Sequence, residues 1–256
     1  MTVDELAPAR GLRRAGAQLA LAVSFLTVVP VRARGAADLG AAAAWFPAVG
    51  AAIGALAGGV RVGAEPVLGA TAATVLAMAT LVLATGALHQ DGLADTADGL
   101  GVRGDRERRL AVMRDSATGA FGVLALVGWA LLLLAAVAPL SQREALAALV
   151  TAGALSRWAA LLHAAGTPPA RPEGLGAGFQ VGRTGLVVAS VCAVVAAGIA
   201  AGALPGLVAL AVTAAIALLS GVAARHAIGG RTGDTIGATV ALVEVAVCTT
   251  LLGFWR

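Results

Sequence analysis

Three aspartates, Asp91, Asp95 and Asp98, follow an apolar run at spacings of four and three residues. In a helix this spacing keeps the three carboxylates within roughly 60° of arc, on one face. Like charges so placed repel each other by about a few tenths of a kcal/mol per pair, and by more where water is excluded. Hard carboxylate oxygens suit Mg²⁺, with Mn²⁺ as an alternative. We therefore predict a divalent metal site on this face; the competing interpretation is a solvated acidic helix end.

A second acidic motif follows at Arg114, Asp115 and Ser116. Asp115 is predicted either to supply a fourth metal ligand or to act as a general base. Ser116 is placed to cap the next helix, whose N-terminus would favour an anion. The candidate catalytic and metal-binding residues are therefore Asp91, Asp95, Asp98 and Asp115.

A glycine-rich turn, Gly229 to Asp234, leads into the last apolar segment. Backbone amides beside glycine, together with Arg231, favour a phosphate cradle in which Thr232 and Asp234 are further candidate contacts. The turn is not a P-loop, because it lacks the Gly-Lys-Ser/Thr ending. The alternative is a plain helix entry with Asp234 as its cap.

Two ionisable residues, Arg157 and Glu244, lie deep in apolar segments. An intramembrane carboxylate is costly and is normally functional or paired. By sign, Arg157 is the expected partner of Glu244. His89, just before the aspartates, is either a substrate contact or an interfacial residue.

The composition defines the class of protein that positions these residues. The chain has 256 residues, of which 59% are hydrophobic and 12% charged, and its mean hydropathy is +0.89. A soluble domain carries about 25% charged residues, and the dyad alternation of a transmembrane barrel is absent. We predict an all-α polytopic integral membrane helix bundle, in one domain over residues 1–256. Transmembrane spans are expected at 41–60, 66–88, 119–139, 145–165, 184–203, 206–224 and 235–255.

Two details of the bundle follow from the apolar segments. Residues 17–31 are short for a crossing, so we expect a re-entrant or interfacial helix there. We expect the helix at 66–88 to continue beyond the membrane through the aspartates and to end near Gly101. Gly50, Gly54 and Gly58 predict close helix packing through small side chains in the first span.

All 18 basic residues are arginines, and nearly all lie in short loops between the spans. The positive-inside rule explains them better than a nucleic-acid partner, which we do not expect. If the seven spans alternate, one side carries fourteen arginines and the other three, so the first side is predicted to be cytoplasmic. The acidic motifs and the glycine-rich turn fall on that same side, which predicts one site facing the cytoplasm.

Several motifs together resemble a known family. They are Phe25-Leu-Thr-Val-Val-Pro30, Phe46-Pro47 with Gly50, His89-x-Asp91-Gly-Leu-Ala-Asp95-x-x-Asp98-Gly99, Met113-x-Asp115-Ser116, Glu173-Gly-Leu-Gly176, Gly229-Gly-x-Thr-Gly-Asp234 and Glu244. In type and order they resemble the cobalamin-5'-phosphate synthases, also called adenosylcobinamide-GDP ribazoletransferases. The chain departs from the family pattern at Gln90, where Leu is frequent, and at Ala241, where a second Glu is common.

The resemblance implies a Mg²⁺-dependent transferase of late vitamin B12 assembly. Its small-molecule partners would be adenosylcobinamide-GDP and α-ribazole, or α-ribazole 5'-phosphate, with GMP released. The candidate substrate-binding residues are then His89, Arg114, Ser116, Arg231, Thr232, Asp234 and Glu244, with the two arginines on pyrophosphate oxygens. The setting would be a bacterial cytoplasmic (inner) membrane, with lipid around the bundle; a homo-oligomer stays open.

Two other functions fit part of the pattern. A CDP-alcohol phosphotransferase also uses an Asp-Gly-x-x-Ala start with later aspartates. Those enzymes carry an Arg after the Ala, where Asp95 stands here, and their later Gly-x-x-x-Asp-x-x-x-Asp pattern is missing. A secondary transporter would place ionisable residues near the membrane midplane, whereas here only Arg157 and Glu244 lie deep.

Overall fold

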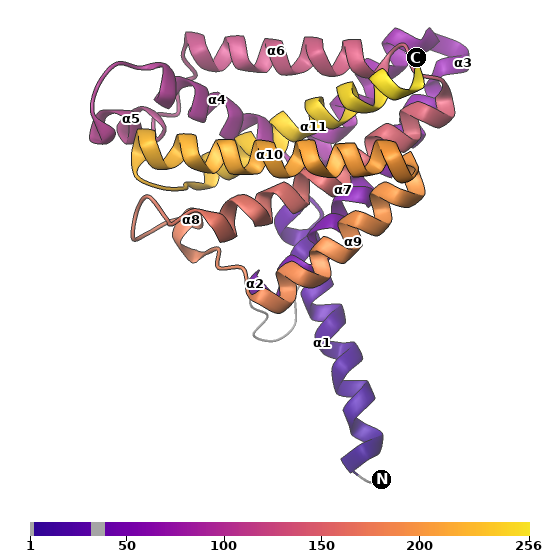
Figure 1. Ribbon diagram of the computed structural model, residues 1–256, viewed down its shortest axis with the longest axis horizontal. Helices are drawn as coiled ribbons and strands as arrows, with labels where there is room; N and C mark the ends of the chain where they lie inside the picture. Colours follow the sequence, from indigo (N-terminus) through magenta and orange to yellow (C-terminus); the bar gives the residue numbers. More distant parts are fainter. Residues whose placement is uncertain (1–2, 32–38) are drawn as a thin grey trace.

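The computed structural model describes residues 3–31 and 39–256, and the regular elements within them are helices (Figure 1). They are α1 (Val3–Leu26), α2 (Leu39–Ala42), the short 3₁₀ helix η1 (Ala43–Trp45), α3 (Phe46–Thr85), α4 (Leu88–Gly101), α5 (Arg106–Val112), α6 (Ala120–Val137), α7 (Gln142–Gly166), α8 (Leu175–Gly178), α9 (Arg183–Ala201), α10 (Ala203–Ile228) and α11 (Gly233–Trp255). In these residues the one extended pairing is an isolated bridge between Pro169 and Arg231. The predicted all-α class is confirmed.

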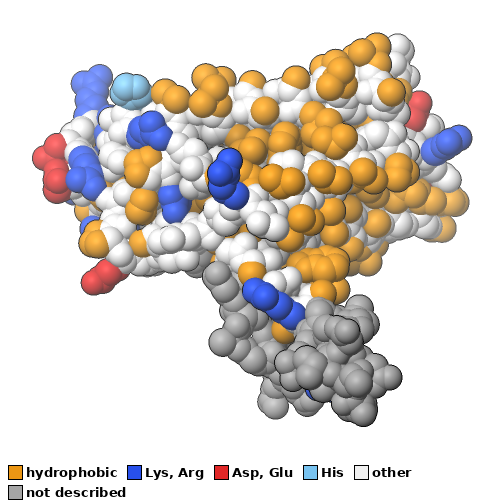
Figure 2. Space-filling model, turned by 60° about the horizontal axis from the view of Figure 1, so that its bottom comes forward, with side chains coloured by type: hydrophobic (Ala, Val, Ile, Leu, Met, Phe, Trp, Pro, Cys, Tyr) orange, Lys and Arg blue, Asp and Glu red, His pale blue; other side chains and the backbone are white. Residues whose placement is uncertain are grey.

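Six helical stretches of the described residues are long and apolar enough to cross a membrane. They are Leu39–Thr85, Ala120–Val137, Gln142–Gly166, Arg183–Ala201, Ala203–Ile228 and Gly233–Trp255. Figure 2 shows hydrophobic side chains over the middle of the molecule and most charged side chains toward its two ends. A lipid bilayer supplies the apolar surroundings that such a band requires. The chain is therefore a multi-pass membrane protein.

The first of these stretches contains α3, which folds back on itself at Gly69. This glycine has φ of 75° and ψ of 166°, a conformation outside the helix. Arg61 Nε donates to Thr74 Oγ1 over 2.8 Å, although thirteen residues of straight helix would hold the two roughly 20 Å apart. The two halves therefore lie side by side. The predicted spans at 41–60 and 66–88 are present, but the turn between them comes later than expected.

The turn is displaced because the charged residues predicted to form it stay helical. Arg61 Nη1 and Glu65 Oε2, four residues apart, form an ion pair of 2.6 Å, and the Arg61 side chain is fully buried. Arg61 Nη2 also donates to the carbonyl oxygens of Ala138 and Leu140, beyond the end of α6. An arginine that is paired and hydrogen-bonded in this way can lie inside a bundle. Residues 61–65 are consequently helix rather than loop.

The aspartates form a helix of their own, α4, so the predicted continuation of the preceding span is wrong. Gly86 and Ala87, with φ of 61° and 60°, break the chain between α3 and α4. For alanine this left-handed conformation costs roughly 1–2 kcal/mol, so tertiary packing must impose it. α4 turns back to pack against α6 and α11, and it ends at Gly101 as expected.

The central helix of the bundle is α7. In its most apolar stretch 72% of the residues are buried, against 22–28% for α6, α9 and α10. Its closest neighbour is α3: an ideal Cβ on Gly50 or Gly54 would lie 2.1 Å from the carbonyl oxygen of Gly153 or Leu149. The predicted close packing through Gly50, Gly54 and Gly58 is confirmed.

The apolar segment predicted at 17–31 is the end of a longer helix. α1 projects from the bundle and ends at Leu26 (Figure 1). None of its described residues meets the criteria of a membrane span. Beyond α1, Val28 N donates to the Ala84 carbonyl over 2.9 Å. The segment is thus fastened beside the junction of α3 and α4.

Adding one methyl group between α3 and α7 should destabilise the bundle. Gly54→Ala forces a Cβ into the α7 backbone, and overpacking of this kind costs about 1–3 kcal/mol. The apparent Tm in detergent should fall by roughly 2–12 °C for a chain of this size. Gly59→Ala is the matched control, because a Cβ there has no neighbour within 4 Å. Equal midpoints for the two variants would contradict the contact.

Candidate functional site

The loops at one end of the bundle are bound to one another by arginine side chains. Arg106 Nε donates to the Ile228 carbonyl over 2.8 Å, which joins α5 to the end of α10. Arg171 Nη2 donates to the Leu110 carbonyl over 3.0 Å, which joins the loop before α8 to α5. The predicted gathering of the polar loops at one end is confirmed.

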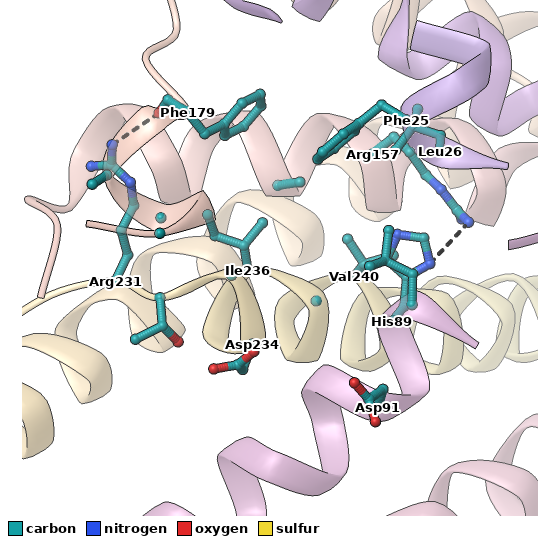
Figure 3. Close-up of a pocket in the computed structure, with 18 of the residues that line it drawn as sticks. Phe25, Leu26, His89, Asp91, Arg157, Phe179, Arg231, Asp234, Ile236 and Val240 are labelled. Carbon is teal, nitrogen blue, oxygen red and sulfur yellow. Dashed lines mark hydrogen bonds between the residues drawn. The ribbon is translucent and has the colours of Figure 1, made fainter. Parts of the chain in front are cut away.

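A cavity of about 220 Å³ lies among these loops. Its wall is built by residues of α1, α3, α4, α7 and α11 and by the segment around α8. Figure 3 shows Asp91 and Asp234 on one side of it and Phe25 and Phe179 on the other. The cavity therefore has an acidic side and an aromatic side.

The acidic side brings together aspartates from α4 and α11. The two helices approach so closely at Gly92 that a Cβ there would lie 2.8 Å from the Asp234 carbonyl oxygen. Partial burial raises the pKa of Asp95 to about 6, and the negative charges of Asp91, Asp234 and Asp98 add to this effect. The sequence placed Asp234 in a separate turn, and only the packing of α4 on α11 assigns it to the aspartate group.

Asp98 has a structural role that its sequence context did not indicate. Its buried carboxylate accepts hydrogen bonds from Gly119 N over 2.7 Å and Gly122 N over 2.9 Å. Gly119 is the N-cap of α6 and has no side chain to cap the helix. Asp98 satisfies these amides and places its charge at the positive end of the helix dipole. The anion expected at this helix is thus Asp98, and the prediction that Ser116 caps it is wrong.

The α4 aspartates predicted to bind a divalent metal ion lie near one another but do not converge on one point. As the side chains stand, no group of three or more His, Cys, Asp or Glu in the described part of the chain is arranged to hold a metal ion. Asp98 has both oxygens on α6 amides, whereas Asp91, Asp95 and Asp234 form no ion pair with any described residue. A divalent cation would relieve the repulsion that raises the pKa of Asp95. The donor chemistry fits Mg²⁺ or Mn²⁺, so the metal site stays a prediction.

Asp115 and Ser116 lie on an exposed turn outside the cavity. Asp115 Oδ1 accepts a hydrogen bond from Ala117 N over 3.1 Å, which is a local contact within the turn. No described interaction connects Asp115 with the aspartates of α4. Its role as a fourth ligand or general base, and a substrate contact by Ser116, stay predictions.

Arg114 and Arg171 form a cationic edge to the site. Together with Pro172, Glu173 and Gly174 they line a shallow hollow, and Arg171 also lines the main cavity. Burial lowers the pKa of Arg171, and the nearby charge of Arg114 lowers it further. Two guanidinium groups this close repel each other, and an anionic oxygen between them would relieve that repulsion. In the sequence Arg171 counted only toward the topology, although it lies two residues before Glu173, the start of a family-like motif.

Arg231 holds the loop rather than presenting a free guanidinium to the cavity. Its side chain is buried and donates to the carbonyl oxygens of Thr167 and Phe179. Its backbone N also donates to the Pro168 carbonyl over 2.8 Å. Both terminal nitrogens therefore already have acceptors. The predicted contact of Arg231 with pyrophosphate has less support here than one by Arg171.

The start of α11 is capped by Thr232 and not by Asp234. Thr232 and Thr235 form a reciprocal capping box, so the alternative that made Asp234 the cap is wrong. The amides of Gly233 and Asp234 lie in the first turn, where no acceptor exists within the helix. Both residues line the cavity, which places two backbone donors beside the acidic side.

The deep ion pair predicted between Arg157 and Glu244 is present. Arg157 Nη1 lies 2.6 Å from Glu244 Oε1, and both side chains are buried. Arg157 Nη2 also lies 3.4 Å from Nδ1 of His89 (Figure 3). Burial, followed by the charge of Arg157, holds the pKa of His89 well below its usual range. His89 is a buried, neutral residue of the cavity wall and not an interfacial one.

Sequence reasoning did not identify the aromatic side of the cavity. Phe25, Phe46 and Phe179 come from α1, from the start of α3 and from the residue after α8. Their ring centroids lie 5.7, 6.1 and 5.5 Å apart in the three pairs. No local pattern connects three residues so far apart in sequence. The available signal was that Phe25 and Phe46 belong to family-like motifs.

Fold and cavity define a multi-pass helical membrane protein with a site of aspartates and arginines at one end of its bundle. The family model described as cobalamin-5-phosphate synthase matches residues 18–252, and the chain belongs to this family. The two alternatives, a CDP-alcohol phosphotransferase and a secondary transporter, are therefore not supported.

Relatives named adenosylcobinamide-GDP ribazoletransferase align over most of the chain. One from Azorhizobium caulinodans is 39% identical over 94% of this chain and 97% of its own. One from Bradyrhizobium diazoefficiens is 38% identical over 95% and 96%. One from Xanthobacter autotrophicus is 43% identical over 81% of each. No solved structure matches the chain.

Removing the Asp98 carboxylate should destabilise the fold more than removing that of Asp91. Asp98→Ala leaves two amides of α6 without an acceptor, which costs about 1–3 kcal/mol. Its apparent Tm in detergent should fall by roughly 2–12 °C. Asp91→Ala, at an exposed position on the same helix, should stay close to the wild-type midpoint. If both variants melt together, Asp98 does not cap α6.

Breaking the buried ion pair should be costly, and removing both partners should be less so. Glu244→Ala strands the Arg157 charge, and such a loss costs about 3–5 kcal/mol. The double variant Arg157→Leu/Glu244→Leu should recover most of the apparent Tm. Glu107→Ala, an exposed carboxylate of α5, is the control. A double variant as unstable as Glu244→Ala would show that the destabilisation does not come from the unpaired arginine.

Proposed function

We propose that this protein is an adenosylcobinamide-GDP ribazoletransferase, which joins adenosylcobinamide-GDP to α-ribazole or α-ribazole 5'-phosphate and releases GMP. The observation that carries the proposal is the family match over residues 18–252, together with relatives of that name over nearly the whole chain. The site is consistent with it, since aspartates and arginines meet in one cavity as phosphoryl-type transfer requires.

The reaction forms one bond and breaks one. A ribazole hydroxyl oxygen attacks the phosphorus attached to cobinamide, the bond from that phosphorus to the bridging oxygen breaks, and GMP leaves with that oxygen. The hydroxyl proton would pass to a carboxylate at the acidic side; the candidates are Asp91 and Asp234, which line the cavity, and Asp95, whose charge is coupled to theirs. Asp115, exposed outside the cavity, is the less favoured candidate base.

Asp91, Asp95 and Asp234 are the residues that would hold Mg²⁺, with Asp98 behind them on the α6 amides. When bound, the ion would offset charge on the phosphate oxygens. Arg171 and Arg114 would bind pyrophosphate oxygens from the cationic edge, while Arg231 positions the loop that carries Arg171. The first-turn amides of α11 are suited to a further phosphate oxygen.

The cavity would open on the cytoplasmic side of the membrane. The end of the bundle that carries the site also carries most of the arginines that flank the spans. By the positive-inside rule, this end would face the cytoplasm. A bacterial cytoplasmic membrane would then present the cavity to water-soluble nucleotide substrates on their own side. Lipid would cover the apolar band of Figure 2.

Asp95→Asn should abolish most Mg²⁺-dependent transfer while leaving the protein folded. Loss of one side chain that stabilises charge in the transition state typically costs about 10²–10³ in rate. Purified protein, adenosylcobinamide-GDP and α-ribazole are mixed, and GMP and the corrinoid product are quantified with Mg²⁺, with Mn²⁺ and with chelator. Asp105→Asn, on the exposed α5 cap, is the control and should keep wild-type turnover. Wild-type turnover in Asp95→Asn would refute the site assignment, and no product from wild-type protein would refute the function.

A further inference from the structure

The aromatic side of the cavity has a shape suited to one flat ring system. The three centroid distances of 5.7, 6.1 and 5.5 Å are nearly equal, so the rings of Phe25, Phe46 and Phe179 form a triangle and not a column. Their planes are within 14° to 22° of parallel. No ring is sandwiched between the other two, and the cluster keeps an apolar surface toward the cavity that all three line.

His89 presents a hydrogen-bond donor beside this surface. Arg157 can only donate hydrogen bonds, so His89 Nδ1, which faces Arg157 Nη2 at 3.4 Å, must accept. The imidazole then carries its proton on Nε2. No described residue accepts from Nε2, and Figure 3 shows the ring edge opposite the Arg157 contact turned toward the cavity. Arg157 Nε is likewise buried without an acceptor.

The two sides of the cavity lie opposite each other. In Figure 3 Phe25 and Phe179 face across the cavity toward Asp91 and Asp234, with Ile236 and Val240 between them. A ligand that fills the space would therefore be apolar and planar at one end and polar at the other. That description fits a nucleoside with an apolar base.

We propose that the surface formed by Phe25, Phe46 and Phe179 binds the benzimidazole base of the ribazole substrate, with His89 Nε2–H donating to its free ring nitrogen. The proposal rests on the proposed function and adds the position of one substrate. A benzimidazole nucleoside offers a flat apolar ring with one acceptor nitrogen and no donor, which matches an aromatic surface with the His89 donor beside it. Its ribose hydroxyls then point to the carboxylates.

The guanine of the second substrate fits this surface poorly. Guanine also offers O6 and N7 as acceptors for His89, but its N–H and amino donors would lie against the apolar rings without a partner. Buried unpaired donors are a strong basis for rejecting a ligand. The guanine is therefore expected outside this aromatic surface.

Equilibrium binding to the purified full chain tests the base site without turnover. α-Ribazole is titrated by calorimetry into wild type, Phe25→Leu and Phe254→Leu; the last is a matched control on an exposed phenylalanine at the far end of the chain. Loss of one stacking ring should weaken binding about tenfold in Phe25→Leu and leave Phe254→Leu unchanged. GMP, titrated in parallel, should bind all three proteins alike.

A change in the ligand tests the hydrogen bond without relying on a folded variant. Wild type should bind α-ribazole about fivefold or more tightly than the indole analogue, in which CH replaces the free ring nitrogen. In His89→Leu this preference should vanish, because the donor is gone. Weaker α-ribazole binding in Phe25→Leu, together with loss of the preference over indole in His89→Leu, would support the proposed base site.

Three outcomes overturn the inference. They are α-ribazole binding that is unaffected in Phe25→Leu, weakened GMP binding in that variant in place of weakened ribazole binding, or no preference against the indole analogue in wild type. In each case continued GMP release from adenosylcobinamide-GDP would leave the proposed function standing. Wild-type protein that neither binds α-ribazole nor releases GMP would instead remove both.

Discussion

A buried arginine constrains the arrangement of the site. Arg157 leaves the central helix α7 and reaches Glu244 of α11 and His89 of α4. Removing a guanidinium from water costs several kcal/mol unless it is paired and hydrogen-bonded, so these helices must pack in a way that brings the three groups together. α4 also carries Asp91 and Asp95, and α11 carries Asp234. The contact that neutralises the arginine therefore also sets the two helices that build the acidic side.

Close helix packing without large side chains makes this arrangement tight. Within a bilayer the lipid tails are as apolar as leucine, so helices associate through contact of their backbones and small residues. Gly50 and Gly54 bring α3 onto α7, and Gly92 brings α4 onto α11. A larger residue at Gly92 would push α4 away from Asp234. The distance between the aspartates thus depends on a glycine that has no chemistry of its own.

The sequence predicted the parts of the fold that depend on composition and helical period. Apolar runs predicted the spans, and the arginine counts predicted the end at which the polar loops gather. The opposite charges of Arg157 and Glu244 predicted their pairing. It did not predict the turn at Gly69, because a buried ion pair keeps residues 61–65 helical. Nor did it predict the break at Ala87, since nothing in an alanine signals a left-handed conformation that packing imposes.

The candidate site divides in the same way. The spacing of Asp91, Asp95 and Asp98 is a local property, so the sequence alone predicts that they share a helix face. It does not predict the different surroundings of the three carboxylates. Asp98 binds the α6 amides. Asp234 lies near Asp91 and Asp95 although it is more than a hundred residues away in sequence. The three phenylalanines are similarly distant in sequence. Such assignments depend on which helices touch, and single-chain patterns do not contain that information.

The division of labour among the aspartates follows from their electrostatics. Four carboxylates in one partly buried group repel one another, and the raised pKa of Asp95 reports that repulsion. Asp98 is stabilised by two amides and by the dipole at the N-terminus of α6, although its negative charge still adds to the raised pKa of Asp95. Asp91, Asp95 and Asp234 form no ion pair with a described residue, and Asp91 and Asp234 lie opposite the aromatic side of the cavity (Figure 3). A group of this kind would suit the divalent cation that we propose on the acidic side of the cavity, and the aromatic side would be left to the apolar ring of our further proposal.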